Sequence, residues 1–211
     1  RGKGIKPIVG VDAWIQNEAE RDKPHRALLI CKNRAGYGQL CELLTRAYLD
    51  NKHRGRAEMR REWFENGAAA DLVCLSGAMS GDIGAAIAAG NVEQAAQLAA
   101  DWARLFPDAF YIEIQRAGHP GTETYIRHAV DIAGRLGLPV VATHPVQFLK
   151  REDFKAHEAR VCIAQGYVLA DKRRPRRFTE EQYFKSPEEM QALFADVPEA
   201  LANTVEIARR C

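Results

Sequence analysis

The sequence lacks any close pairing of cysteines. Its five cysteines are scattered along 211 residues, and none forms a CxxC pair. An odd, scattered set is typical of free thiols in a reducing compartment and not of a disulfide framework. We therefore predict a cytoplasmic protein whose cysteines stay reduced: Cys31, Cys41, Cys74, Cys162 and Cys211.

Long apolar runs and a charge excess are also missing. No run approaches the roughly 18 apolar residues that a membrane-spanning helix needs, so we expect no membrane contact. The net charge is only +2, whereas a dedicated nucleic-acid-binding domain commonly has a pI above about 9. The hydrophobic content of 46% is enough for one domain with a real core.

The common catalytic motifs are absent. The sequence contains no Walker phosphate loop, no GxGxxG, no GxSxG nucleophile elbow and no HExxH. These absences argue against the usual nucleotide-binding, hydrolase and zincin sites. No two of the six histidines have the spacing of a zinc finger or a zincin helix: His25, His53, His119, His128, His144 and His157.

Apolar runs of strand length alternate with segments of helical periodicity. This order predicts an α/β fold with a parallel sheet, either open or closed into a barrel. Residues 16–24 are a polar loop and 33–36 a turn. Strands are expected at 5–9, 11–15, 27–31, 71–75, 109–114 and 138–143, and helices at 39–49, 83–89, 92–105, 122–136, 151–164, after Ser186 and through Arg210.

Three polar residues lie near strand ends, where the sites of α/β proteins gather. Asp12 follows Gly10 within a strand, and His144 follows the strand at 138–143. His25 precedes a strand, so we expect it at the opposite end of the sheet. Asp12 and His144 alone supply too few donors for a metal site, which favours the polar rim of a pocket.

Two segments are strongly basic. Residues 51–61 form one of them, and a cluster around Pro175 forms the other. Clustered cations can bind phosphates, so a DNA-binding module is one interpretation. The favoured interpretation is a solvated connector, or one that pairs with acidic residues at 180–189. The cluster consists of Lys172, Arg173, Arg174, Arg176 and Arg177.

Several long strings occur in order along the chain: GIKPIVGVD at 4–12, NRAGYGQL at 33–40, LSGAMSG at 75–81, LPVVATHPVQF at 138–148 and PEALANTVEIARR at 198–210. They resemble the N-terminal PHP (polymerase and histidinol phosphatase) domain of bacterial DNA polymerase III alpha subunits. The resemblance implies a distorted, TIM-like (β/α) barrel, seven-stranded in the family and here missing its first strands. It implies a PHP domain over 1–178 and a helical segment over 179–211 that leads toward the polymerase core.

A barrel without its first strands exposes an apolar strand edge, which favours aggregation. We therefore expect an N-terminally extended chain to be more soluble than this one and to have a higher thermal midpoint. Equal solubility and equal midpoints for the two chains would contradict this expectation.

The resemblance also identifies the positions at which family members with an intact site hold metal. Here Asp12 is still a possible ligand, and His25 stands beside the replaced Arg26, so a shift of one residue would restore that position. A divalent cation needs several donors that converge on it. We therefore expect no bound metal and no catalytic residue in this chain, with His25 and His144 left in a residual polar pocket. The degenerate positions are Asp12, Arg26, Ala78, Pro145 and Gln147.

The function that the resemblance implies belongs to a larger protein. The parent is expected to be a DNA-directed DNA polymerase, a nucleotidyltransferase that uses Mg²⁺ and contacts DNA outside this chain. This piece is expected to be a non-catalytic scaffold that docks the proofreading exonuclease subunit of the polymerase III holoenzyme. The alternatives are a metal-dependent phosphoesterase or 3′–5′ exonuclease, and a DNA-binding module that uses residues 172–177.

Overall fold

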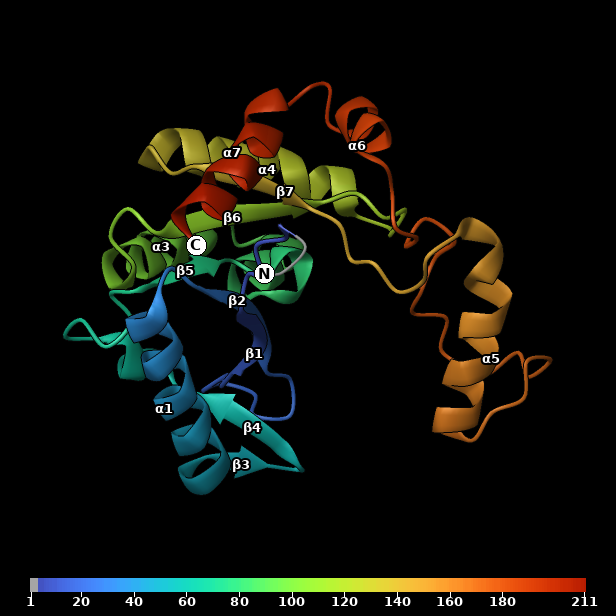
Figure 1. The fold of residues 1–211 in the computed structure, drawn as a ribbon. Coiled ribbons are helices and arrows are strands. Elements are labelled where there is room, and N and C mark those ends of the chain that lie inside the picture. The colour runs from blue at the N-terminus through green and yellow to red at the C-terminus, as the bar shows by residue number, and fades with distance from the viewer. Residues whose placement is uncertain (1–3) are drawn as a thin grey trace.

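A seven-stranded sheet forms the centre of the molecule (Figure 1). The computed structural model describes residues 4–211. The strand order is β3-β4-β1-β2-β5-β6-β7, and the sheet does not close, so β3 and β7 are its edges. The α/β class is confirmed, and the open sheet agrees with a PHP-type distorted barrel. The strands are β1 (Gly10–Ile15), β2 (His25–Cys31), β3 (Lys52–His53), β4 (Arg56–Met59), β5 (Leu72–Leu75), β6 (Phe110–Gln115) and β7 (Val140–Thr143).

Strands β2 and β3 run opposite to the other five strands of the sheet. Strands β5, β6 and β7 run parallel, as predicted. The prediction of a parallel sheet is wrong for β2, which is antiparallel to both β1 and β5. The short loop at 16–24 joins β1 directly to β2, and a parallel pair would need a longer crossover connection.

The expected strand at 5–9 is not formed, and β1 begins at Gly10. A Cβ atom on Gly10 would lie 2.6 Å from the carbonyl oxygen of Leu29. Glycine here allows the close approach of β1 to β2. The segment before it follows the sheet, because the carbonyl oxygen of Val9 accepts a 2.8 Å hydrogen bond from the Cys31 N–H.

The helices largely follow the predicted periodicity, with one early start. Helix α1 begins at Arg34, because the Asn33 side chain caps it by accepting a 3.0 Å hydrogen bond from the Gly36 N–H. The expected turn at 33–36 is therefore the first turn of this helix. The helices are α1 (Arg34–Asp50), α2 (Asp82–Ala88), α3 (Val92–Leu105), α4 (Thr122–Leu136), α5 (Phe154–Gln165), α6 (Pro187–Leu193) and α7 (Pro198–Arg210), with 3₁₀ turns η1 (Arg61–Phe64), η2 (Ala78–Ser80) and η3 (Arg151–Asp153).

The two faces of the sheet are buried differently. Alternate residues such as Leu29 and Ile112 face the helices and form the main core. On the other face, a smaller apolar cluster that includes Val73 and Tyr111 packs against Ile207 of α7. The segment expected to lead out of the domain thus packs on the sheet, while the boundary expected at residue 178 stays a prediction. None of the helices within residues 4–211 has the length and apolar character to cross a membrane.

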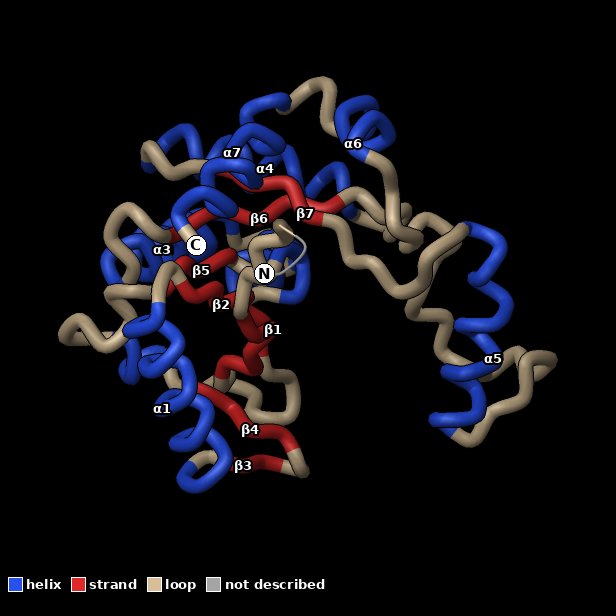
Figure 2. The backbone as a smooth tube through the Cα atoms, viewed as in Figure 1, coloured by secondary structure: helices blue, strands red, loops and turns tan. Residues whose placement is uncertain are grey.

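Residues 149–178 project from the body as an arm that carries α5 (Figures 1 and 2). A parallel bridge between Phe148 and Tyr183 marks its base. The arm has its own aromatic cluster: the His157 ring lies 4.6 Å from the Phe178 ring and 5.4 Å from the Phe148 ring, between centroids. The arm is therefore a folded projection and not an extended loop.

Candidate functional site at the carboxyl edge of the sheet

The carboxyl ends of β5, β6 and β7 meet at one edge of the sheet. Because β2 runs antiparallel to β5, its first residues, His25 and Arg26, reach this same edge. The prediction that His25 lies at the opposite end is therefore wrong. The strand registers place Asp12, Arg26, Glu113 and Thr143 on one face of the sheet, away from the main core.

Arg26 forms an ion pair with Asp12, which is the one possible metal ligand retained at the expected positions. Its Nε donates to Asp12 Oδ1 over 2.8 Å, and a second guanidinium nitrogen pairs with Oδ2. The guanidinium carbon also lies 3.9 Å from the centre of the Trp14 ring. Arginine stays charged in proteins, so Arg26 neutralises Asp12 and repels any cation that approaches it.

The remaining positions of the family ligand set offer no cluster of donors. Ala78 is buried in η2, Gln147 is exposed, and the Pro145 carbonyl oxygen accepts a 3.1 Å hydrogen bond from Gln182. No group of three or more His, Cys, Asp or Glu residues suited to a metal occurs within residues 4–211. The residue types at this edge therefore do not fit a divalent cation.

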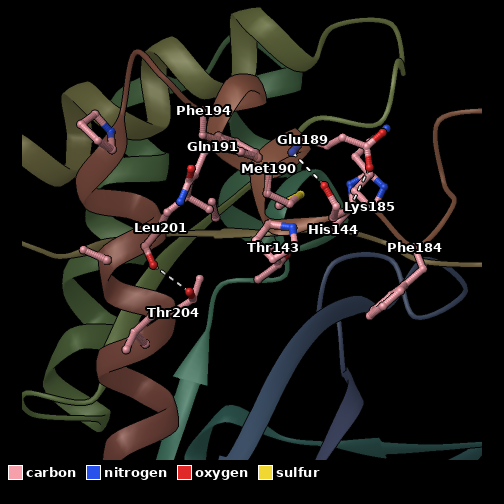
Figure 3. A pocket seen from close by; sticks show the side chains of 16 residues that line it. Thr143, His144, Phe184, Lys185, Glu189, Met190, Gln191, Phe194, Leu201 and Thr204 are labelled. Atoms are coloured by element: carbon pink, nitrogen blue, oxygen red, sulfur yellow. Dashed lines mark hydrogen bonds between the residues drawn. The ribbon is translucent and has the colours of Figure 1, made fainter.

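The two histidines expected in one residual pocket line separate cavities. His144 Nε2 lies 2.8 Å from the Glu181 carbonyl oxygen, and burial lowers the pKa of its imidazole. It lines a cavity of about 1240 Å³ beside β7, together with Thr143 and residues of α6 and α7 (Figure 3). His25 lines another cavity with Arg61, and burial lowers its pKa too.

The centre of the edge is Glu113, which the sequence did not single out. Its carboxylate is buried and accepts hydrogen bonds from Thr143 Oγ1 and, over 3.1 Å, from Gln115 Nε2. Its backbone is also fixed: Ser76 Oγ accepts from its N–H over 2.9 Å, and the Tyr125 hydroxyl donates to its carbonyl over 2.7 Å. The only sequence signal was one carboxylate within the apolar strand FYIEIQ.

Burial raises the pKa of Glu113 above its ordinary value near 4.5, and the negative charge of Asp12 adds to the rise. The folded protein therefore holds this proton more tightly than the unfolded chain does. Protonated Glu113 stabilises the fold fully at a pH below the pKa that its carboxyl has in the unfolded chain. This stabilisation is lost as pH rises through the higher pKa of the folded protein.

We therefore expect the Glu113→Gln variant to gain thermal stability relative to the wild type as pH is raised from about 4 to about 8. Thermal midpoints measured across this range test the expectation. Glu93→Gln is the control: Arg135 lowers the pKa of Glu93, so the relative stability of that variant should fall with rising pH. A pH-independent difference for Glu113→Gln would contradict the expected linkage.

The basic cluster at 172–177 lies on the arm, away from the sheet edge. Two of its cations are already paired: Arg173 contacts Asp171 over 2.8 Å, and Arg174 pairs with the buried Glu158. In the 51–61 segment, Arg56 pairs with Glu58 and Arg61 with Asp82. Within residues 4–211, three cations of the cluster form no ion pair: Lys172, Arg176 and Arg177.

An open α/β sheet with polar residues at the carboxyl edge of its parallel strands is the arrangement in which α/β proteins form their sites, and it agrees with a PHP-type domain. Comparison with known families agrees with this class, because residues 1–117 match the model described as "PHP domain". The chain belongs to the PHP domain family.

The chain is also similar to polymerase subunits along its whole length. It is 53% identical over 213 residues to DNA polymerase III subunit alpha of Neisseria meningitidis serogroup A, 46% identical over 210 residues to that of Pseudomonas fluorescens, and 42% identical over 210 residues to that of Escherichia coli K12. Each match covers all of this chain and 18–19% of the relative. The chain thus spans about a fifth of the length of these relatives.

Proposed function

We propose that this chain is the PHP region of a replicative DNA polymerase III alpha subunit and that it acts as a scaffold without catalysis of its own. It docks the proofreading exonuclease subunit. Similarity along the whole of this chain to part of three alpha subunits supports the placement. Polymerisation, with its Mg²⁺ and its DNA contacts, then belongs to other parts of the subunit.

The Asp12–Arg26 ion pair is the observation that carries the scaffold proposal. Metal-dependent phosphoesterases use bound cations to activate water and to clamp the leaving oxygen. Here a permanent cation of the protein itself neutralises the one retained carboxylate, and Ala78, Pro145 and Gln147 offer no ligand of comparable strength. A partner that proofreads separately would supply the nuclease activity that this edge lacks.

Metal content and nuclease activity together test the lack of catalysis. In the alpha subunit that carries this chain, dialysed in metal-free buffer, we expect elemental analysis to find zinc, manganese and iron far below one ion per polypeptide. We also expect no chelator-sensitive release of 3′ nucleotides. A PHP domain with all its ligands intact serves as the positive control. One tightly held metal per polypeptide, together with nuclease activity, would restore the phosphoesterase interpretation.

Binding to the exonuclease subunit tests the docking role. The alpha subunit that carries this chain is expected to bind the immobilised exonuclease subunit, and deletion of the PHP region should abolish that binding. A deletion variant that still folds and binds equally well would show that the exonuclease docks elsewhere.

A further inference from the structure

The arm at 149–178 and its base display an unusual amount of apolar surface. Ile163 is 83% exposed and Val168 is 69% exposed. Scattered single exposures are normal for a protein surface, but grouped ones mark interaction sites. Seven of the sixteen large exposed apolar side chains among the described residues lie between 146 and 184: Val146, Leu149, Ile163, Tyr167, Val168, Leu169 and Phe184.

The arm holds these side chains on a fixed framework. Arg174 Nε donates to the Leu169 carbonyl over 3.2 Å, and its guanidinium pairs with Glu158 of α5. This ties the segment after α5 back onto the helix. The Tyr167 N–H also donates to the Cys162 carbonyl over 2.9 Å and closes the helix end. A surface ordered before binding loses less conformational entropy when a partner covers it.

The arm also differs in charge from the rest of the chain. Residues 149–178 contain nine Lys and Arg against four Asp and Glu, a net charge of +5. The whole chain carries +2, so the remaining residues carry a net charge of −3. A complementary partner surface is therefore acidic as well as apolar.

Two other classes of partner fit the arm less well. DNA would satisfy Lys172, Arg176 and Arg177 but would leave Ile163 and Val168 in water. A membrane surface favours a helix with one continuous apolar face, whereas the exposed apolar side chains here gather at the carboxyl end of α5 and in the segment that follows. A protein surface with apolar contacts and a charged rim matches both features.

We propose that the arm is an interdomain contact: it docks on an acidic, apolar surface of the same alpha-subunit polypeptide outside these 211 residues. The relatives contain further polypeptide on which such a surface is expected, because this chain spans only 18–19% of their length. A tethered partner acts at an effective concentration on the order of millimolar. Highly apolar surfaces are also typical of permanent contacts rather than transient ones. The inference rests on the proposed function only in placing this chain within an alpha subunit.

Hydrogen exchange of the full-length alpha subunit tests the contact. The Ile163→Asp/Val168→Asp variant is expected to exchange amides in the arm at least about tenfold faster than the wild type, with no other subunit present. A second set of peptides, outside the 211 residues, should lose protection in parallel, which a purely local disturbance of the arm would not cause. Arg176→Glu/Arg177→Glu should produce a weaker form of the same pattern.

Leu49→Asp is the matched control, because Leu49 is 77% exposed on α1 and lies outside the arm. It should leave both sets of peptides unchanged. Unchanged exchange in the arm variants would overturn the proposal. So would protection of the arm that appears only after the exonuclease subunit or primed DNA is added. Exonuclease binding is measured separately, so its failure would refute the docking role and leave this contact standing.

Discussion

Replacing Gly77 with alanine is expected to lower the free energy of unfolding by more than about 3 kcal/mol. Gly77 follows β5 at the candidate site and has φ of +76°, a conformation that costs an L-residue roughly 1–2 kcal/mol. A Cβ atom there would overlap the carbonyl oxygen of Arg26. The added carbon must therefore displace the start of β2 and, with it, the Asp12–Arg26 pair.

Unfolding by denaturant measures this loss of free energy, provided that the slope of free energy against denaturant concentration is the same for wild type and variant. Gly134→Ala is the matched control, because Gly134 lies inside α4 and nothing outside that helix lies within 4 Å of its added Cβ. Alanine should stabilise this helix position by about 0.5–1 kcal/mol. If the two substitutions changed stability equally, the close packing of Gly77 against β2 would be disproved.

Replacing Asp82 with alanine is expected to cost about 3 kcal/mol of stability. The Asp82 carboxylate is buried at the start of α2 and accepts from Trp102 Nε1 over 2.9 Å. It also accepts from the Ile83 N–H over 2.8 Å and pairs with Arg61. Its removal leaves the buried indole N–H and the guanidinium of Arg61 without their acceptor, and a buried donor without a partner is costly.

Asp82→Asn separates the two contributions. It keeps an oxygen acceptor for the indole but removes the charge that Arg61 contacts, so about half of the loss is expected. Asp131→Ala is the control, because Asp131 is exposed and meets Arg135 only at 3.9 Å. That change should cost under about 0.5 kcal/mol. A loss as small as this for Asp82→Ala would show that Trp102 and Arg61 find other partners.

The order of apolar and polar residues along the sequence was sufficient to predict most of the helices and strands. Apolar alternation and helical periodicity located β5, β6, β7 and the helices α2, α3, α4 and α7, because these patterns reflect which face of a local segment is buried. The start of α6 after Ser186 was also predicted, and in the structure Ser186 and Glu189 satisfy backbone N–H groups within one turn. The replaced ligand positions were identified only through the resemblance to the PHP family, and the loss of metal binding stays a prediction.

Only the tertiary structure decided how these elements meet. Strand direction depends on pairing between distant segments, so the reversal of β2 that carries His25 and Arg26 to the site edge was not readable. The pairing of Arg26 with Asp12 and the burial of Glu113 have the same origin. His144 bonds the Glu181 carbonyl beside β7, whereas His25 lines a different cavity together with Arg61. The sequence by itself determined the α/β class, because burial patterns are local, whereas non-local packing decided which charged groups neutralise one another.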